Sequence, residues 1–134
     1  MKALDDALYS KLSGDTTLMG YLAGGVHPVV AVNPTFPYLV FQKVGGAEPI
    51  YTLTRRVNAP FLYQFRVIGK GPSKVAPNNA LERVRTLIDR QALTVTGFTH
   101  WVTQWVGDMP DMSEMDGGQL LIQVGATYRI ELGG

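Results

Sequence analysis

Hydrophobic and polar residues alternate along Phe61–Ile68, where every second side chain is aromatic or aliphatic and Gln64 and Arg66 lie between them. This period of two predicts a β-strand with one buried face. A second strand is predicted over Tyr38–Val44, a run rich in β-branched and aromatic residues. Pro37 precedes this run, and proline is accepted at the first position of a strand because it cannot donate to a ladder. The two strands predict a long β-hairpin.

The connection between these strands, Ala47–Pro60, is longer than ordinary hairpin loops of about two to five residues. It keeps strand-forming residues at Tyr51 and Leu53 and carries Arg55 and Arg56 near its middle. We therefore expect the hairpin to extend past the body of the sheet. Since a lone hairpin is marginally stable in water, we expect these four side chains to contact another chain. The alternative is a mobile surface loop.

Two further strands are predicted in the second half of the chain. Phe98–Val106 places Trp101 and Trp105 on one side and valines on the other. Apolar residues on both faces predict burial by helices on one side and by a neighbouring subunit on the other, so both tryptophans are candidate interface residues. An acidic loop is expected over Asp108–Gly118, ending in an Asp-Gly-Gly turn. Leu120–Leu132 then alternates regularly and predicts the last strand.

Helical spacing of apolar residues appears in three other stretches. Leu4–Leu12 predicts a first helix, and Asp15 is placed to cap a short second helix over Thr16–Leu22. A third helix is expected from residue 78 or 79 to Arg90, because Pro77 would disturb a helix that began earlier. Its apolar stripe consists of Ala80, Leu81, Val84, Leu87 and Ile88.

This order of elements predicts one α+β domain over residues 1–134. Two hairpins separated by a helix imply an antiparallel four-stranded sheet with helices packed on one face, together with the long β-hairpin extension. Val26–Val32 is interrupted by proline and is at most a short edge strand. The second face of the sheet must meet water or another chain.

Composition narrows the classes of function. The chain of 134 residues has 12 basic and 11 acidic residues, a net charge of +1 and no cysteine. So small a charge gives no strong field for nucleic acid or an anionic membrane, and thiol chemistry is excluded. No signal peptide or membrane-spanning run is expected. The charged fraction of 17% is low. It fits either a surface covered by another chain or a large apolar core.

Candidate chemistry is sparse. Neither His27 nor His100 has a neighbouring carboxylate or serine in a catalytic pattern, so structural roles are favoured. The acidic residues of 108–118 lack the spacing of a calcium loop, and no glycine-rich segment has the phosphate-binding pattern. Arg55, Arg56, Arg66 and Lys70, with aromatic residues nearby, are a weak signal for single-stranded nucleic acid. We expect no enzyme activity, metal or cofactor.

Taken in order, these segments resemble the tail-completion, or tail-terminator, family of long-tailed, siphovirus-like bacteriophages. The resemblance spans nearly the whole chain, with a proline-rich entry to the third helix as its main departure. It rests on the helical region Ala3–Leu22 with its Gly24-Gly25-Val26 exit, the run Phe36–Gly46, the strand Tyr63–Val67, the helix around Ala80, Leu81, Val84 and Leu87, and the Asp116-Gly117-Gly118 turn before the final strand.

The resemblance implies a structural virion protein. Members of this family form a ring, usually a homo-hexamer, that caps the tail tube, ends its polymerisation and joins the tail to the head connector. Its partners would be further copies of itself, the tail tube protein and the head–tail connector protein, with DNA passing through the lumen. It would be located at the neck end of the virion tail after assembly in the host cytoplasm, without a membrane. The alternative is a small nucleic-acid-binding α+β domain, and a hydrolase-like enzyme with an unrecognised site is a third reading.

Overall fold

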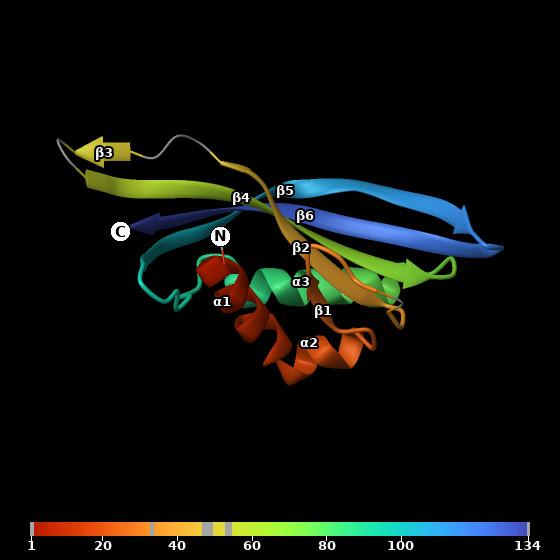
Figure 1. Cartoon of the computed structure of the whole chain (residues 1–134). Coiled ribbons are helices and arrows are strands. Elements are labelled where there is room, and N and C mark those ends of the chain that lie inside the picture. The colour runs from red at the N-terminus through yellow and green to blue at the C-terminus, as the bar shows by residue number, and fades with distance from the viewer. Residues whose placement is uncertain (1, 33, 47–49, 53–54, 134) are drawn as a thin grey trace.

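The computed structural model describes residues 2–32, 34–46, 50–52 and 55–133, and for residues 46, 50–52 and 55–59 it describes the backbone alone. The strands form one layer, and the helices form a second layer against one face of it (Figure 1). The elements are α1 (Lys2–Ser13), α2 (Thr16–Tyr21), β1 (Val26–Pro28), β2 (Tyr38–Gly46), β3 (Ile50–Thr52), β4 (Arg55–Lys70), α3 (Val75–Ile88), β5 (Thr99–Asp116) and β6 (Gln119–Gly133).

The sheet is mixed, which corrects the expectation of four antiparallel strands. Its order is β1-β2-β4-β6-β5, and the pairs from β2 to β5 are antiparallel as expected. The segment 26–28 adds a parallel strand beside β2, with Val26 opposite Leu39. The parallel direction follows from the connection over residues 29–37, which brings the chain back to the same end of the sheet before β2 begins. The expected α+β class with helices on one face is confirmed.

The core lies between the helices and the facing side of the sheet. The alternation predicted for Phe61–Ile68 is confirmed, since Tyr63, Phe65 and Val67 are buried and Phe61 packs against them. The stripe of the third helix is also confirmed. The core contributions of the helices are Leu4, Leu8 and Leu12 of α1, Leu18 of α2, and Ala80, Val84 and Ile88 of α3, with Leu81 and Leu87 packed beside them.

α3 begins at Val75, three or four residues earlier than the sequence predicted. Pro77 lies in its first turn, where the backbone N–H groups have no partner inside the helix, so the missing donor costs nothing there. The N–H of Val75 donates to Ser73 Oγ at 3.3 Å. Pro77 is buried against β4, where a side chain on Gly69 would approach its Cγ to 2.7 Å. The proline thus joins the helix to the sheet and does not disturb it.

The expected acidic loop over Asp108–Gly118 is wrong, because β5 continues as a strand to Asp116. Asp116 pairs with Gln119 across a two-residue turn of Gly117 and Gly118. Both glycines have positive φ, +57° and +81°, which is the geometry of the tight turn that suits a twisted hairpin. The turn itself was predicted correctly, and the backbone pairing that it sets extends the strand.

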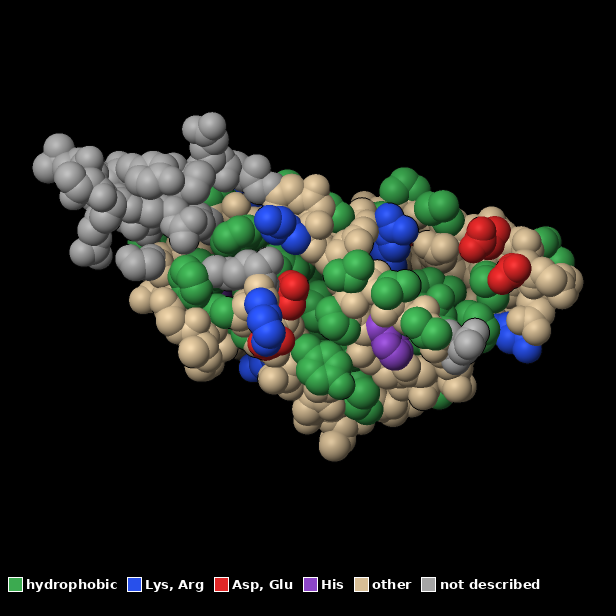
Figure 2. Space-filling view, viewed as in Figure 1, with side chains coloured by type: hydrophobic (Ala, Val, Ile, Leu, Met, Phe, Trp, Pro, Cys, Tyr) green, Lys and Arg blue, Asp and Glu red, His purple; other side chains and the backbone are tan. Residues whose placement is uncertain are grey.

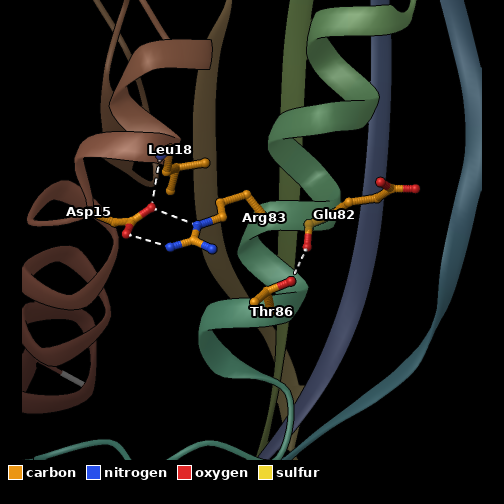
Figure 3. A network of polar contacts seen from close by, with 5 residues as sticks. All are labelled: Asp15, Leu18, Glu82, Arg83 and Thr86. Atoms are coloured by element: carbon orange, nitrogen blue, oxygen red, sulfur yellow. Dashed lines mark hydrogen bonds and ion pairs between the residues drawn. The ribbon is translucent and has the colours of Figure 1, made fainter.

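Asp15, in the corner between α1 and α2, joins α2 to α3, as Figure 3 shows. It caps α2 as predicted, since its Oδ2 accepts a hydrogen bond from the Leu18 N–H at 2.8 Å. The same carboxylate accepts two bonds from Arg83 of α3, each at 2.9 Å. In α3 itself, Thr86 Oγ1 donates to the Glu82 carbonyl at 3.2 Å. The corner between α1 and α2 is therefore fixed to the middle of α3.

The hairpin extension is seen in the backbone of β3 and β4. Ile50 lies opposite Asn58 and Thr52 opposite Arg55, whereas the ladder with β6 begins at Ala59. Figure 1 shows β3 at one end of the sheet and the β5–β6 turn at the other. The described chain therefore projects hairpins at two opposite ends.

Candidate assembly surface

The two tryptophans of β5 lie on opposite faces of the sheet, which corrects the expectation that they share one. The register of β5 against β6 shifts between His100 and Val102 and again after Trp105, so side chains no longer alternate simply along the strand. Trp105 pairs with the buried Tyr128 and lies beneath the Arg85 guanidinium of α3, 4.2 Å from the ring centre. Trp105 is therefore part of the layer that packs on the helices.

Trp101 is directed away from the helices. The Trp101 ring occupies the space that a Cβ on Gly133 would enter. By alternation along β6, that Cβ would lie on the face opposite to the buried Leu132 side chain. The Trp101 side chain is 49% exposed. Of the two predicted tryptophans, Trp101 alone stays available to a partner on the outer face of the sheet.

The face of the sheet turned away from the helices is polar and weakly charged. Arg66 Nε donates to Gln64 Oε1 at 2.9 Å, and Arg129 is paired with Glu131 at 2.6 Å. These arginines are engaged by neighbours of their own face and do not form a continuous basic track. A shallow cavity of about 170 Å³ on this face is lined by Val29, Tyr38, Val40, Gln42, Gln64, Arg66, Ile68 and Gln123.

The end of the β5–β6 hairpin, residues 108–119, carries acidic and apolar side chains together; we call it the acidic arm. Its four carboxylates, Asp108, Asp111, Glu114 and Asp116, occur without any lysine or arginine between them. Asp108 accepts from Trp105 Nε1 at 3.2 Å, and Asp111 is paired with Lys74 at 3.0 Å. For Glu114 and Asp116 the described residues provide no ion-pair partner.

Apolar side chains are exposed on the same arm. Met112 is 54% and Met115 68% exposed, and Met112 pairs with Gln123, which lines the cavity of the outer face. Figure 2 shows acidic and hydrophobic side chains together at the end of the molecule opposite the grey atoms. Burial, reinforced by the negative charge of Glu114, raises the pKa of Tyr38 above its ordinary value. An apolar surface bordered by carboxylates is typical of a protein–protein contact.

The predicted residues of the hairpin extension are only partly described. Tyr51 lies on β3 opposite Arg56, and Arg55 lies opposite Thr52, all by backbone position. Leu53 lies outside the described residues. The structure therefore brings Tyr51, Arg55 and Arg56 together at one end of the sheet. Trp101 lies toward the same end, since its neighbour His100 and Ala59 both pair with Leu132, whereas Trp105 lies farther along β6 at Tyr128.

The histidines have local contacts. His27 Nε2 lies 2.6 Å from the Gly24 carbonyl oxygen, and the ring meets Tyr38 edge-on. His100 Nε2 lies 2.7 Å from Thr103 Oγ1, and burial lowers the pKa of this imidazole. These contacts fit the structural roles predicted for both.

A groove of about 760 Å³ lies between α1 and residues 92–96. Asp6 is the carboxylate that lines it, and Lys2 pairs with it at 2.6 Å. In the described part of the chain, no three histidine or acidic side chains are grouped to hold a metal. No helix there has the length and apolar character to cross a membrane.

The exposed methionines of the acidic arm were not predicted from the sequence as candidate interface residues. The signal was the regular interval of methionine within the acidic stretch, at Met109, Met112 and Met115. In a loop these residues have no defined neighbours. In the strand, with its register shift between Met109 and Met112, each methionine lies opposite a defined residue of β6.

Comparison with family models gave no match, and none of the curated proteins matched. Solved structures do match. A chain of the virion of a native gene transfer agent particle has a TM-score of 0.80 at 16% identity, covering 99% of this chain and 96% of that one. The gp17 protein of bacteriophage SPP1 has a TM-score of 0.60 at 19% identity, covering 96% and 88%. The fold is thus shared over nearly the full length of each chain, and the resemblance noted from the sequence is confirmed at the level of the fold.

Proposed function

We propose that this protein is a structural virion component that ends a phage-type tail. Six copies form a ring on the tail tube, stop its polymerisation and join it to the head connector at the neck, and DNA passes through the lumen. The observation that carries this proposal is the shared fold with a virion chain, which extends over almost the whole of both proteins. The acidic arm and the outer sheet face give such a subunit surfaces for neighbours.

The proposal makes the protein a binding component and not a catalyst. Its partners are further copies of itself, the tube protein and the connector protein. It is located at the neck end of the tail, and it assembles there in the host cytoplasm. The polar outer face with its paired arginines supports a surface that meets protein or passes DNA without holding it tightly.

The test is deletion of the coding sequence from the particle that encodes it, followed by electron microscopy of lysates. Filled heads and separate tails of irregular length are expected, with normal particles restored when the protein is supplied from a plasmid. Deletion particles with joined tails of normal length would overturn the proposal. A matched control is a plasmid encoding a chain with a stop codon in α1.

A further inference from the structure

We infer that the acidic arm of one subunit binds the basic tip of a second copy, the tip being residues 50–52 of β3 and 55–57 of β4. The inference rests on the proposed function and identifies the contact between neighbouring subunits. It starts from the arm, which has exposed Met112 and Met115 beside Glu114 and Asp116. A partner for this surface must supply cationic groups next to apolar ones.

The chain itself contains a segment of this chemistry. Residues 50–57 include Arg55 and Arg56, no acidic residue, and the apolar residues Ile50, Tyr51 and Val57. Arginine and tyrosine are the residue types most enriched at the centres of protein interfaces. Because this segment matches the acidic arm in opposite charge and in apolar character, we take a second copy of this chain as the partner that binds the arm.

The position of the two segments in the fold prevents the contact from forming within one molecule. Figure 1 shows β3 at one end of the sheet and the β5–β6 turn at the other. A contact between opposite ends can therefore form only between two copies, and it is head-to-tail. Repeated contacts of this kind close into a ring when the rotation between subunits allows it.

The contact uses side chains and not strand pairing along the free edge of β5. Pro110 lies in the arm and has no N–H to donate, and the register shifts between Met109 and Met112. Prolines, bulges and charges on an edge strand disfavour addition of another strand. The arm therefore presents its carboxylates and methionines to a neighbour while its backbone edge stays unpaired.

Charge reversal on the full-length chain tests the contact. One variant carries Glu114→Arg with Asp116→Arg, and a second carries Arg55→Glu with Arg56→Glu. In sedimentation equilibrium at low salt, we expect each variant to self-associate at least about tenfold more weakly than the unchanged chain. We expect the self-association constant of the chain with all four changes to lie within about threefold of that of the unchanged chain. The reason is that the two segments again carry opposite charges, with the signs exchanged.

The matched control for the arm variant is Asp6→Arg with Glu82→Arg. It makes the same change in net charge as Glu114→Arg with Asp116→Arg, but on the exposed sides of α1 and α3. Its association should equal that of the unchanged chain. A neutral variant, Glu114→Gln with Asp116→Asn, keeps the test open if charge reversal prevents folding, and it should also associate more weakly. Unfolding curves establish that each variant is folded.

The inference would be overturned if the chain with Glu114→Arg and Asp116→Arg associated as strongly as the unchanged chain. It would also be overturned if the variant with all four changes did not regain its self-association. A wild-type chain that remains monomeric at the highest attainable concentration overturns it too. These results are distinguishable from failure of the proposed function. If the chain completes tails normally but the charge exchange has no effect, the contact is wrong and the tail role stands. If deletion leaves tails normal, the tail role is wrong whatever the arms bind.

Discussion

Arg83 holds the Asp15 carboxylate with two nitrogens, each 2.9 Å from a different oxygen, while Leu18 donates its backbone N–H to the same group. A two-pronged arginine–carboxylate pair fixes orientation as well as charge. Through it α3 is held against the start of α2. The guanidinium, more than the backbone N–H, holds the pKa of Asp15 below its ordinary value.

Replacing Asp15 separates its two roles. Asp15→Asn keeps a good N-cap and removes the charge, whereas Asp15→Ala removes both. We expect the alanine variant to lose about 0.5–2 kcal/mol of stability from the cap alone, measured by urea unfolding. A carboxylate with a depressed pKa stabilises the fold above its unfolded pKa, and this contribution is lost as the pH falls through the folded value. The difference between the wild type and Asp15→Asn should therefore be present at pH 7 and disappear well below about pH 4. A difference that stayed constant with pH would contradict the ion pair.

The buried Tyr63 should be sensitive to loss of its hydroxyl. Its Oη donates to Asp5 Oδ1 at 2.6 Å, which joins the central strand to α1. Tyr63→Phe should lower the free energy of unfolding by about 1–3 kcal/mol, because the bond is to a carboxylate. Tyr9→Phe, on the exposed side of α1, is the control and should leave the unfolding curve unchanged. Equal curves for the two variants would mean that the bond contributes nothing.

Gly69 and Pro77 form a contact that can be tested by a double-mutant cycle. Gly69→Ala places a methyl group against Pro77 and should cost about 1–3 kcal/mol through overpacking. Adding Pro77→Ala should recover part of the loss, since the clashing ring is gone. Gly107→Ala is the control, because a Cβ there meets nothing within 4 Å. If the two changes are simply additive, the start of α3 does not depend on this contact.

The opposite orientation of the two tryptophans predicts opposite phenotypes. Trp105→Ala should lower the free energy of unfolding by about 2 kcal/mol or more, because its ring packs between Arg85 and the core. Trp101→Ala should leave the melting temperature of the isolated subunit nearly unchanged and weaken binding to a partner, if the outer face is an interface. Thermal unfolding and tail completion, measured on both variants, check this. Equal losses of stability in the two variants would mean that the indole rings of Trp101 and Trp105 lie on the same face of the sheet.

The strands with one buried face could be predicted from the sequence, and the arm could not. From Tyr63 to Val67 burial selects every second residue, so the period of two is visible. Residues 108–116 are exposed or only partly buried, so no burial pattern marks them as a strand. Their conformation is set by the glycine turn and by backbone pairing with β6. The opposite faces of Trp101 and Trp105 could not be predicted for a similar reason. They depend on a register shift in β5, which is set by pairing with β6 and not by the sequence of β5 alone.

The start of α3 was missed, and β1 was expected only as at most a short edge strand with no direction given, for related reasons. The rule against proline in helices applies after the first turn, and Pro77 lies within it. Three residues of β1 are too few to show a period, and their parallel pairing depends on where residues 29–37 return the chain. The hairpin extension that carries Arg55 and Arg56 was predicted from the length and composition of its sequence, whereas the acidic stretch was noticed but predicted as a loop.

The length of β4 has a mechanical consequence. Its first residues pair with β3 at the projecting end, and the rest runs between β2 and β6 through the middle of the sheet. A pull on that end acts along the strand axis, so the ladders on both sides are loaded in shear and their hydrogen bonds resist together. In the proposed role at the neck of a tail, this geometry would let the projecting hairpin carry tension between subunits. β4, the strand that projects from the subunit, is therefore also held by hydrogen bonds on both sides against being pulled out of the sheet.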